Sequence, residues 1–128
     1  MKITCGTDII EVKRVQEAIE SLGEKFINKI FTPSEILYCN NKQKMKYQHF
    51  AARFAAKEAI FKAISELLND KYEITWTDVE ILPDENKKPR VYFLNNKHLK
   101  IKQIDISLSH IQEYATAMCV VLSEEGEK

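Results

Sequence analysis

The sequence predicts an α+β fold in which a largely antiparallel sheet packs against one long central helix. One alternating segment opens the chain, helical periodicity follows it, and the second half contains four short strand candidates. A strand, a group of helices and then a run of strands is typical of this class. The chain has 128 residues, and no repeat or linker divides it, so we expect residues 1–128 to form a single domain.

A strand and a helix are predicted at the start of the chain. The alternating pattern over residues 3–9 indicates a strand that ends near Asp8. Apolar residues over 12–22 then recur at helical spacing, and Gly23 follows them where a helix typically stops.

Two more helices are expected before the run of strands. The motif Thr32-Pro33-Ser34-Glu35 has the form of a capping box with proline at the first helical position, which predicts a short helix through about Cys39. Residues 49–68 form the longest helical stretch. The four strands are then expected at residues 78–82, 90–94, 103–109 and 114–122.

The composition excludes several classes of protein. No apolar run approaches the ~20 residues of a membrane-spanning helix, and the first residues lack the apolar region of a signal peptide. The three cysteines are far apart and form no C-x-x-C pair, so we expect free thiols in a reducing cytoplasm. The 19 basic and 19 acidic residues give zero net charge, so bulk attraction to nucleic acid is not expected.

Charge is nevertheless unevenly placed along the chain. Residues 42–62 are strongly basic, and residues 66–85 are strongly acidic. Neighbouring segments of this kind are typical of two solvated faces, although the basic segment is also compatible with an anion site.

The long helix has an ammonium group inside its apolar stripe. At 100° per residue, its aromatic and aliphatic residues share one arc, and Lys57 lies in the middle of it. One interpretation is that Lys57 extends past the rings to water and that Glu58 and Lys62 form a surface i,i+4 pair. The other is that Arg53, Lys57 and Lys62 bind a phosphate ligand while Glu58 binds its metal.

The other candidate residues also have two interpretations each. Asp8, at the end of the first strand, either caps the following helix or binds a hard cation such as Mg²⁺, which takes one or two carboxylates plus phosphates. Ser109 and His110 end a predicted strand and are by default turn residues. Lys13 and Arg14 lie outside the apolar stripe of their helix and are by default solvated charges.

Three segments of the chain, in order, resemble the holo-[acyl-carrier-protein] synthases, the small bacterial branch of the 4′-phosphopantetheinyl transferases. They are GTDIIEVKR at 6–14, RFAAKEAIFKA at 53–63 and SLSHIQEYA at 107–115. The resemblance covers essentially the whole chain. It implies a 4′-phosphopantetheinyl transferase-like fold and a homotrimer with active sites between subunits, acting in the cytoplasm in fatty acid biosynthesis.

The resemblance also implies a reaction and a role for each candidate residue. The 4′-phosphopantetheine group of coenzyme A would be transferred to a serine of apo acyl carrier protein, with Mg²⁺ bound and adenosine 3′,5′-bisphosphate released. Asp8 and Glu58 would hold the metal, and Glu58 and Lys62 would be catalytic. The coenzyme A-binding residues would be Arg53, Lys57, Lys62, Ser109 and His110, and those that contact the carrier protein would be Lys13 and Arg14.

The chain departs from the family pattern at two turns. Ser65-Glu66-Leu67-Leu68 has the pattern of continued helix where relatives carry a glycine turn, and Asn86-Lys87-Lys88-Pro89 replaces the usual Asn-Gly-Lys-Pro. Two other functions compete with transfer. A Mg²⁺-dependent phosphatase or nucleotide hydrolase would use the same carboxylates, but the chain has no glycine-rich phosphate loop. A non-catalytic nucleic-acid-binding module would use the basic segment 42–62.

Overall fold

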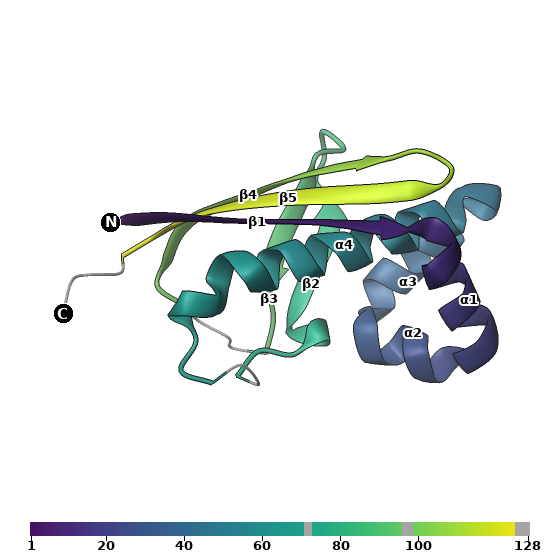
Figure 1. Cartoon of the computed structure of the whole chain (residues 1–128), viewed down its shortest axis with the longest axis horizontal. Coiled ribbons are helices and arrows are strands. Elements are labelled where there is room, and N and C mark those ends of the chain that lie inside the picture. Colours follow the sequence, from purple (N-terminus) through teal and green to yellow (C-terminus); the bar gives the residue numbers. More distant parts are fainter. Residues whose placement is uncertain (71–72, 96–98, 125–128) are drawn as a thin grey trace.

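A long helix, α4 (Lys46–Ile64), lies across one face of a three-stranded antiparallel sheet in the computed structural model (Figure 1). The structure describes residues 1–70, 73–95 and 99–124. The strand order is β1-β5-β4, with β1 and β4 at the two edges. These strands are β1 (Lys2–Glu11), β4 (Ile101–His110) and β5 (Tyr114–Ser123). The α+β prediction is confirmed.

The remaining elements surround α4. A separate antiparallel pair consists of β2 (Val79–Pro83) and β3 (Pro89–Phe93). Three helices gather at one end of α4 (Figure 1), namely α1 (Val12–Leu22), α2 (Glu24–Ile30) and α3 (Pro33–Asn40). Short 3₁₀ helices occupy Gln43–Met45, Ser65–Leu67 and Trp76–Asp78.

Most predicted elements are present, and two details were wrong. The helix α2 was not predicted, because seven residues are too few to show helical periodicity. The α-helical part of the long helix ends at Ile64, and a 3₁₀ helix over Ser65–Leu67 takes up the rest of the predicted stretch. The Ser65 hydroxyl donates to the Lys62 carbonyl at 3.1 Å, a local bond that competes with continuation of the helix.

The turn between β2 and β3 forms without a glycine. Lys87 occupies a left-handed conformation at φ 66°, at the position where the family motif has glycine. The Asp84 carboxylate accepts hydrogen bonds from the backbone N–H groups of Asn86 and Lys88, at 2.8 and 3.0 Å. These bonds hold the conformation that a lysine does not otherwise favour.

The strand β1 crosses α4 in backbone-to-backbone contact at Gly6. A Cβ atom on Gly6 would overlap the Ala59 carbonyl oxygen and would lie 2.9 Å from the Ala63 backbone nitrogen. Ala59 and Ala63 are buried, and the Thr4 hydroxyl donates to the Ala63 carbonyl at 2.6 Å. Small residues on both elements therefore permit a contact that larger side chains would prevent.

The opposite face of the sheet carries several exposed apolar side chains on β1 and β5 among the described residues. Alternate side chains of β1 point away from α4, and Ile3 and Ile9 are 72% and 64% exposed. On β5, Met118 and Val120 are exposed on the same face. Solvated sheet faces usually carry polar side chains, so this apolar sheet face is a candidate contact surface.

Within the described ranges, none of the helices has both the length and the apolar character needed to cross a bilayer.

Replacement of Gly6 should destabilise the fold through steric overlap. We expect Gly6→Ala to lower the free energy of unfolding by about 3 kcal/mol, and Gly6→Ser to lower it further. Gly23 provides the matched control, because it has φ 63° but a Cβ added to it would meet no heavy atom of the described residues within 4 Å. Gly23→Ala and Gly23→Ser should therefore show similar losses. Urea denaturation measures all four variants, and a Gly6→Ala loss no larger than that of Gly23→Ala would contradict the close contact.

Candidate active site

The β1–α4 contact brings two carboxylates and an ammonium group together. Asp8 follows Gly6 by two residues, so its side chain points to the same side of β1, toward α4. Lys62 on α4 donates to the Asp8 carboxylate at 3.3 Å and to the Thr7 carbonyl at 2.8 Å. Glu58 lies one helical turn before Lys62 and is close enough to Asp8 to interact with it electrostatically. The structure thus places three predicted site residues side by side.

These contacts exclude one interpretation of Asp8 and change the expected pairing of Lys62. Helix α1 begins at Val12 with Glu11 as its N-cap, so Asp8 lies within a strand and the helix-cap interpretation is wrong. Lys62 pairs with Asp8 on another element, which differs from the expected surface pair with Glu58.

The electrostatics of this group favour a bound cation. Burial raises the pKa of Glu58 above its usual range, and the Asp8 carboxylate raises it further, while Lys62 opposes the shift. Within the described ranges, no group of three or more His, Cys, Asp or Glu side chains is arranged to hold a metal. Two carboxylates nevertheless suit Mg²⁺, which completes its coordination with phosphates and waters.

The two carboxylates open into a surface cleft of about 480 Å³. Its lining residues are Asp8, Ile9, Ile10, Glu11, Arg14, Phe54, Glu58 and Tyr114. Arg14 pairs with Glu11 at 3.2 Å and adds a cation to the lining. We call this the carboxylate cleft.

An apolar groove of about 640 Å³ lies next to the cleft. It is lined by Lys29, Phe61, Ser65, Leu68, Ile74, Thr75 and Trp76. The Trp76 ring stacks on Phe54 with centroids 5.3 Å apart and meets Phe61 edge-on at 5.2 Å. Because Phe54 lines the cleft and Trp76 lines the groove, these two stacked rings form the wall between them.

A third hollow, of about 160 Å³, carries positive charge. Its lining residues are Tyr38, His49, Ala52, Arg53, Pro83, Lys87, Pro89, Leu108 and His110, and these described residues include no carboxylate. The Arg53 guanidinium lies 4.3 Å from the Tyr38 ring centroid, and Arg53 Nε donates to the Ile81 carbonyl at 3.2 Å. We call this the cationic hollow.

The two histidines of the cationic hollow lie against one another. Their ring centroids are 5.2 Å apart, and His110 Nδ1 is buried with no hydrogen-bond partner among the described residues. Burial lowers the pKa of His49 to about 4, with further lowering by Arg53, His110 and Lys42. An anion here would offset the positive charge of Arg53 and Lys87, which fits the predicted role of Arg53 and His110 in binding phosphate.

The carboxylate cleft and the cationic hollow lie at different edges of the sheet. Asp8 is on β1 and His110 is at the end of β4, the opposite edge. Arg53 and Glu58 are five residues apart on α4, so their side chains leave the helix in directions about 140° apart. Arg53 and His110 therefore form a group separate from Asp8, Glu58 and Lys62.

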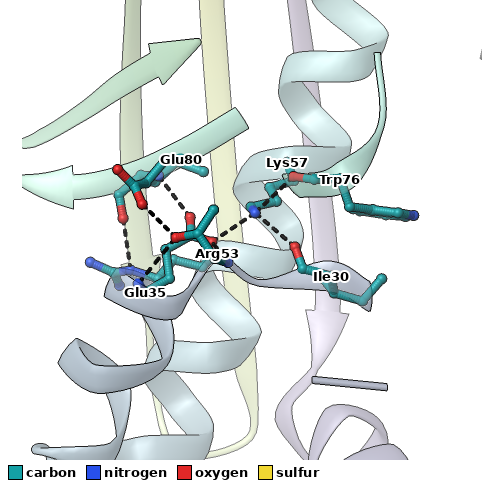
Figure 2. Close-up of polar contacts among 8 residues, drawn as sticks. Ile30, Glu35, Arg53, Lys57, Trp76 and Glu80 are labelled. Carbon is teal, nitrogen blue, oxygen red and sulfur yellow. Dashed lines mark hydrogen bonds and ion pairs between the residues drawn. The ribbon is translucent and has the colours of Figure 1, made fainter. Parts of the chain in front are cut away.

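The prediction that Lys57 binds coenzyme A does not fit the structure. Its side chain is 0% exposed, and its ammonium donates to Glu35, to the Ile30 carbonyl and to the Trp76 carbonyl (Figure 2). Burial lowers the pKa of Lys57, and the Glu35 carboxylate opposes that shift. All three ammonium hydrogens are used inside the protein, so none remains for a phosphate.

Three other predicted residues lie at the surface and apart from one another. Ser109 is exposed and lines neither the carboxylate cleft nor the cationic hollow. Arg14 lines the carboxylate cleft, whereas Lys13 faces a hollow that it shares with Glu17, Glu20 and other carboxylates. The two cations predicted to contact one partner therefore point into different surroundings.

Sequence reasoning missed several residues of these hollows. Trp76 follows no periodic pattern, and His49 lies in a helix with nothing nearby in the sequence to suggest a ligand. Glu35 was assigned only as a capping residue. Nothing in the sequence indicated that its second carboxylate oxygen accepts a hydrogen bond from the Ile81 backbone N–H. These groups meet only through the tertiary fold.

Comparison with known proteins places the chain in a family. A family model described as the 4′-phosphopantetheinyl transferase superfamily matches residues 4–119. The chain is 43% identical to a holo-[acyl-carrier-protein] synthase of Protochlamydia amoebophila, over 94% of this chain and 98% of the relative. It is 45% identical to the synthase of Chlamydia felis, over 91% and 94%.

Solved structures show the same fold. One is a Bacillus anthracis holo-(acyl-carrier-protein) synthase in complex with CoA (3′,5′-ADP), with TM-score 0.78, 30% identity and 94% and 96% coverage of the two chains. Another is the Helicobacter pylori synthase in complex with coenzyme A, with TM-score 0.79, 28% identity and 92% and 99% coverage. The chain therefore belongs to the 4′-phosphopantetheinyl transferase superfamily, as an enzyme of its holo-[acyl-carrier-protein] synthase family.

Proposed function

We propose that this enzyme transfers the 4′-phosphopantetheine group of coenzyme A to a serine of apo acyl carrier protein, with Mg²⁺ bound, and releases adenosine 3′,5′-bisphosphate. The observation that carries the proposal is the group formed by Asp8, Glu58 and Lys62 across the β1–α4 contact. Relatives named holo-[acyl-carrier-protein] synthase and related structures with coenzyme A support it.

Asp8 and Glu58 would hold the Mg²⁺ ion. Their oxygen donors suit a hard cation. Burial and the neighbouring Asp8 carboxylate both raise the pKa of Glu58, and a bound cation would offset both effects. When bound, Mg²⁺ neutralises charge on the phosphates of the substrate.

The same residues suit the proton transfers of the reaction. The serine oxygen forms a bond to the phosphorus that carries the pantetheine arm, and the bond to the bisphosphate leaving group breaks. Glu58 would accept the serine proton, directly or through a water molecule. Lys62, fixed by Asp8 and the Thr7 carbonyl, stabilises the charge that develops on the leaving oxygen.

Coenzyme A would bind across the carboxylate cleft, the apolar groove and the cationic hollow. The cationic hollow, with Arg53 and His110, suits a phosphate of the nucleotide, and Lys62 suits the pyrophosphate. The apolar groove beside Phe61 and Trp76 suits the pantetheine arm. We leave Lys57 out of this set because it is buried and fully hydrogen-bonded.

We propose that the active enzyme is a homotrimer with sites between subunits. The cationic hollow and the carboxylate cleft lie at opposite edges of one sheet, so a nucleotide bound by both kinds of group is most simply shared between neighbours. The apolar sheet face around Ile9 and Met118 offers a contact surface for another copy. The exposed Ser109 would then reach a neighbour's site.

The carrier protein would approach over α1. Arg14 at the mouth of the carboxylate cleft, together with Lys13, would attract an acidic carrier and bring its serine toward Glu58.

We propose that residues 1–128 are one transferase domain that works in the cytoplasm in fatty acid biosynthesis. All three cysteines are free, and burial raises the pKa of the Cys39 and Cys119 thiols to about 12. Such thiols are unreactive and fit a reducing compartment.

A transfer assay tests the proposed function. The protein, coenzyme A, Mg²⁺ and apo acyl carrier protein are incubated, and the carrier is weighed by mass spectrometry. We expect a gain equal to one phosphopantetheine arm, lost in Asp8→Ala and in Glu58→Ala without loss of the fold, because neither change removes core volume. Release of inorganic phosphate with no gain in carrier mass would instead indicate a phosphatase, and an active Asp8→Ala variant would contradict the metal role.

Mixed trimers test the shared site. We expect His110→Ala to damage a neighbour's site and Glu58→Ala to damage its own, so that each variant has low activity alone. Oligomers re-formed from both should regain transfer activity, since some interfaces then pair an intact Glu58 with an intact His110. A fully active monomer in sedimentation at assay concentration would contradict this arrangement.

A further inference from the structure

Lys57 joins three segments of the chain to α4. Its ammonium donates to Glu35 Oε1 at 2.7 Å, to the Ile30 carbonyl at 2.7 Å and to the Trp76 carbonyl at 2.9 Å (Figure 2). These acceptors come from the end of α2, from α3 and from the 3₁₀ helix Trp76–Asp78.

Glu35 completes the set of bonds. Its Oε1 also accepts from the Thr32 backbone N–H at 2.8 Å, and its Oε2 accepts from the Ile81 N–H at 2.7 Å. The side chain is 0% exposed, as is that of Lys57. The Lys57–Glu35 pair therefore ties α3 and β2 to α4 from inside the protein.

This pair fixes the position of Trp76. The tryptophan lies in a 3₁₀ helix of three residues, and Figure 2 shows its ring pointing away from the Lys57 ammonium while its carbonyl points toward it. The ring contacts Phe54 and Phe61, which lie four residues before and three residues after Glu58. The hydrogen bond from Lys57 thus holds the backbone of Trp76, whose ring packs between the carboxylate cleft and the apolar groove.

Stability alone is a weak explanation for the pair. Well-packed apolar residues of similar volume often serve a core as well as a buried ion pair does, because the pair loses its hydration. An apolar residue at position 57, however, would leave the Ile30 and Trp76 carbonyls without this donor. What an ammonium supplies here is a fixed orientation of the segment that carries Trp76.

We propose that Lys57, held by Glu35, is a positioning residue that sets the Trp76 ring as a wall of the coenzyme A site. The proposal rests on the proposed function. The carboxylates Asp8 and Glu58 depend on a different contact, that of β1 with α4 at Gly6. Loss of the pair should therefore disturb substrate binding more than the chemical step.

The test uses the double variant Lys57→Met with Glu35→Gln, which removes both charges and leaves no unpaired buried charge. Trp76 is the only tryptophan of the chain, so intrinsic fluorescence reports on this wall directly. We expect altered Trp76 emission, a KM for coenzyme A about tenfold higher and a kcat within about twofold of wild type. Titration of wild-type Trp76 emission with coenzyme A should saturate, and the variant should need about tenfold more ligand.

Two further variants keep the test decisive. Val121→Ala removes buried volume from the sheet and should lower Tm without changing KM or Trp76 emission, which separates positioning from general loss of stability. Trp76→Leu removes the ring but leaves the pair intact, and should raise KM with kcat retained even if the double variant does not fold.

Wild-type KM and emission in a folded double variant, or wild-type KM in Trp76→Leu, would overturn the proposal. So would a fall in kcat with KM unchanged. If the wild-type protein fails to add mass to the carrier, the proposed function is wrong. The response of Trp76 fluorescence to coenzyme A is measured without carrier, so it still tests the positioning role.

Discussion

The close contact between β1 and α4 at Gly6 is the constraint on which the carboxylate cleft depends. A strand and a helix normally meet through side chains, but here the Gly6 backbone meets the backbone of Ala59 and Ala63. This brings Asp8, two residues along the strand, within electrostatic reach of Glu58 on the helix. The alanines of α4 are therefore required for packing, and through packing they determine where the two carboxylates lie.

The same helix serves three purposes on its different sides. One side carries Glu58 and Lys62 toward β1, another carries Arg53 toward His110 at the other sheet edge, and Lys57 points into the core. A motif with several charges close together in sequence thus divides into a part at the proposed catalytic site, a part at the cationic hollow and a part that pairs inside the core. The first two parts face opposite edges of one sheet, and on this basis we propose that neighbouring subunits complete each site.

Local signals in the sequence predicted the fold better than they predicted the site. The capping box at Thr32 and the glycine stop at Gly23 act within a few residues, and both are present in the structure. No local signal predicted that Asp8 pairs with Lys62, and the family resemblance implied only that both residues belong to one site. The apolar stripe of the helix indicated that Lys57 could be buried, but its partners were not predictable. Glu35 and Trp76 lie about twenty residues away on either side and meet Lys57 only when their segments pack around α4.

A titration of Glu58 tests most directly whether Asp8 and Glu58 form one cation site. Carbon-13 labelling of the carboxylates would follow the Glu58 pKa in wild-type protein and in Asp8→Asn, with and without Mg²⁺. In wild type without metal the pKa should lie above its usual range, since burial and Asp8 both raise it. Mg²⁺ should lower it, because the metal binds the deprotonated carboxylate. Asp8→Asn alone should also lower it and should abolish the response to Mg²⁺. A Glu58 pKa that is unaffected by Asp8→Asn, or a full Mg²⁺ response in that variant, would contradict the shared site.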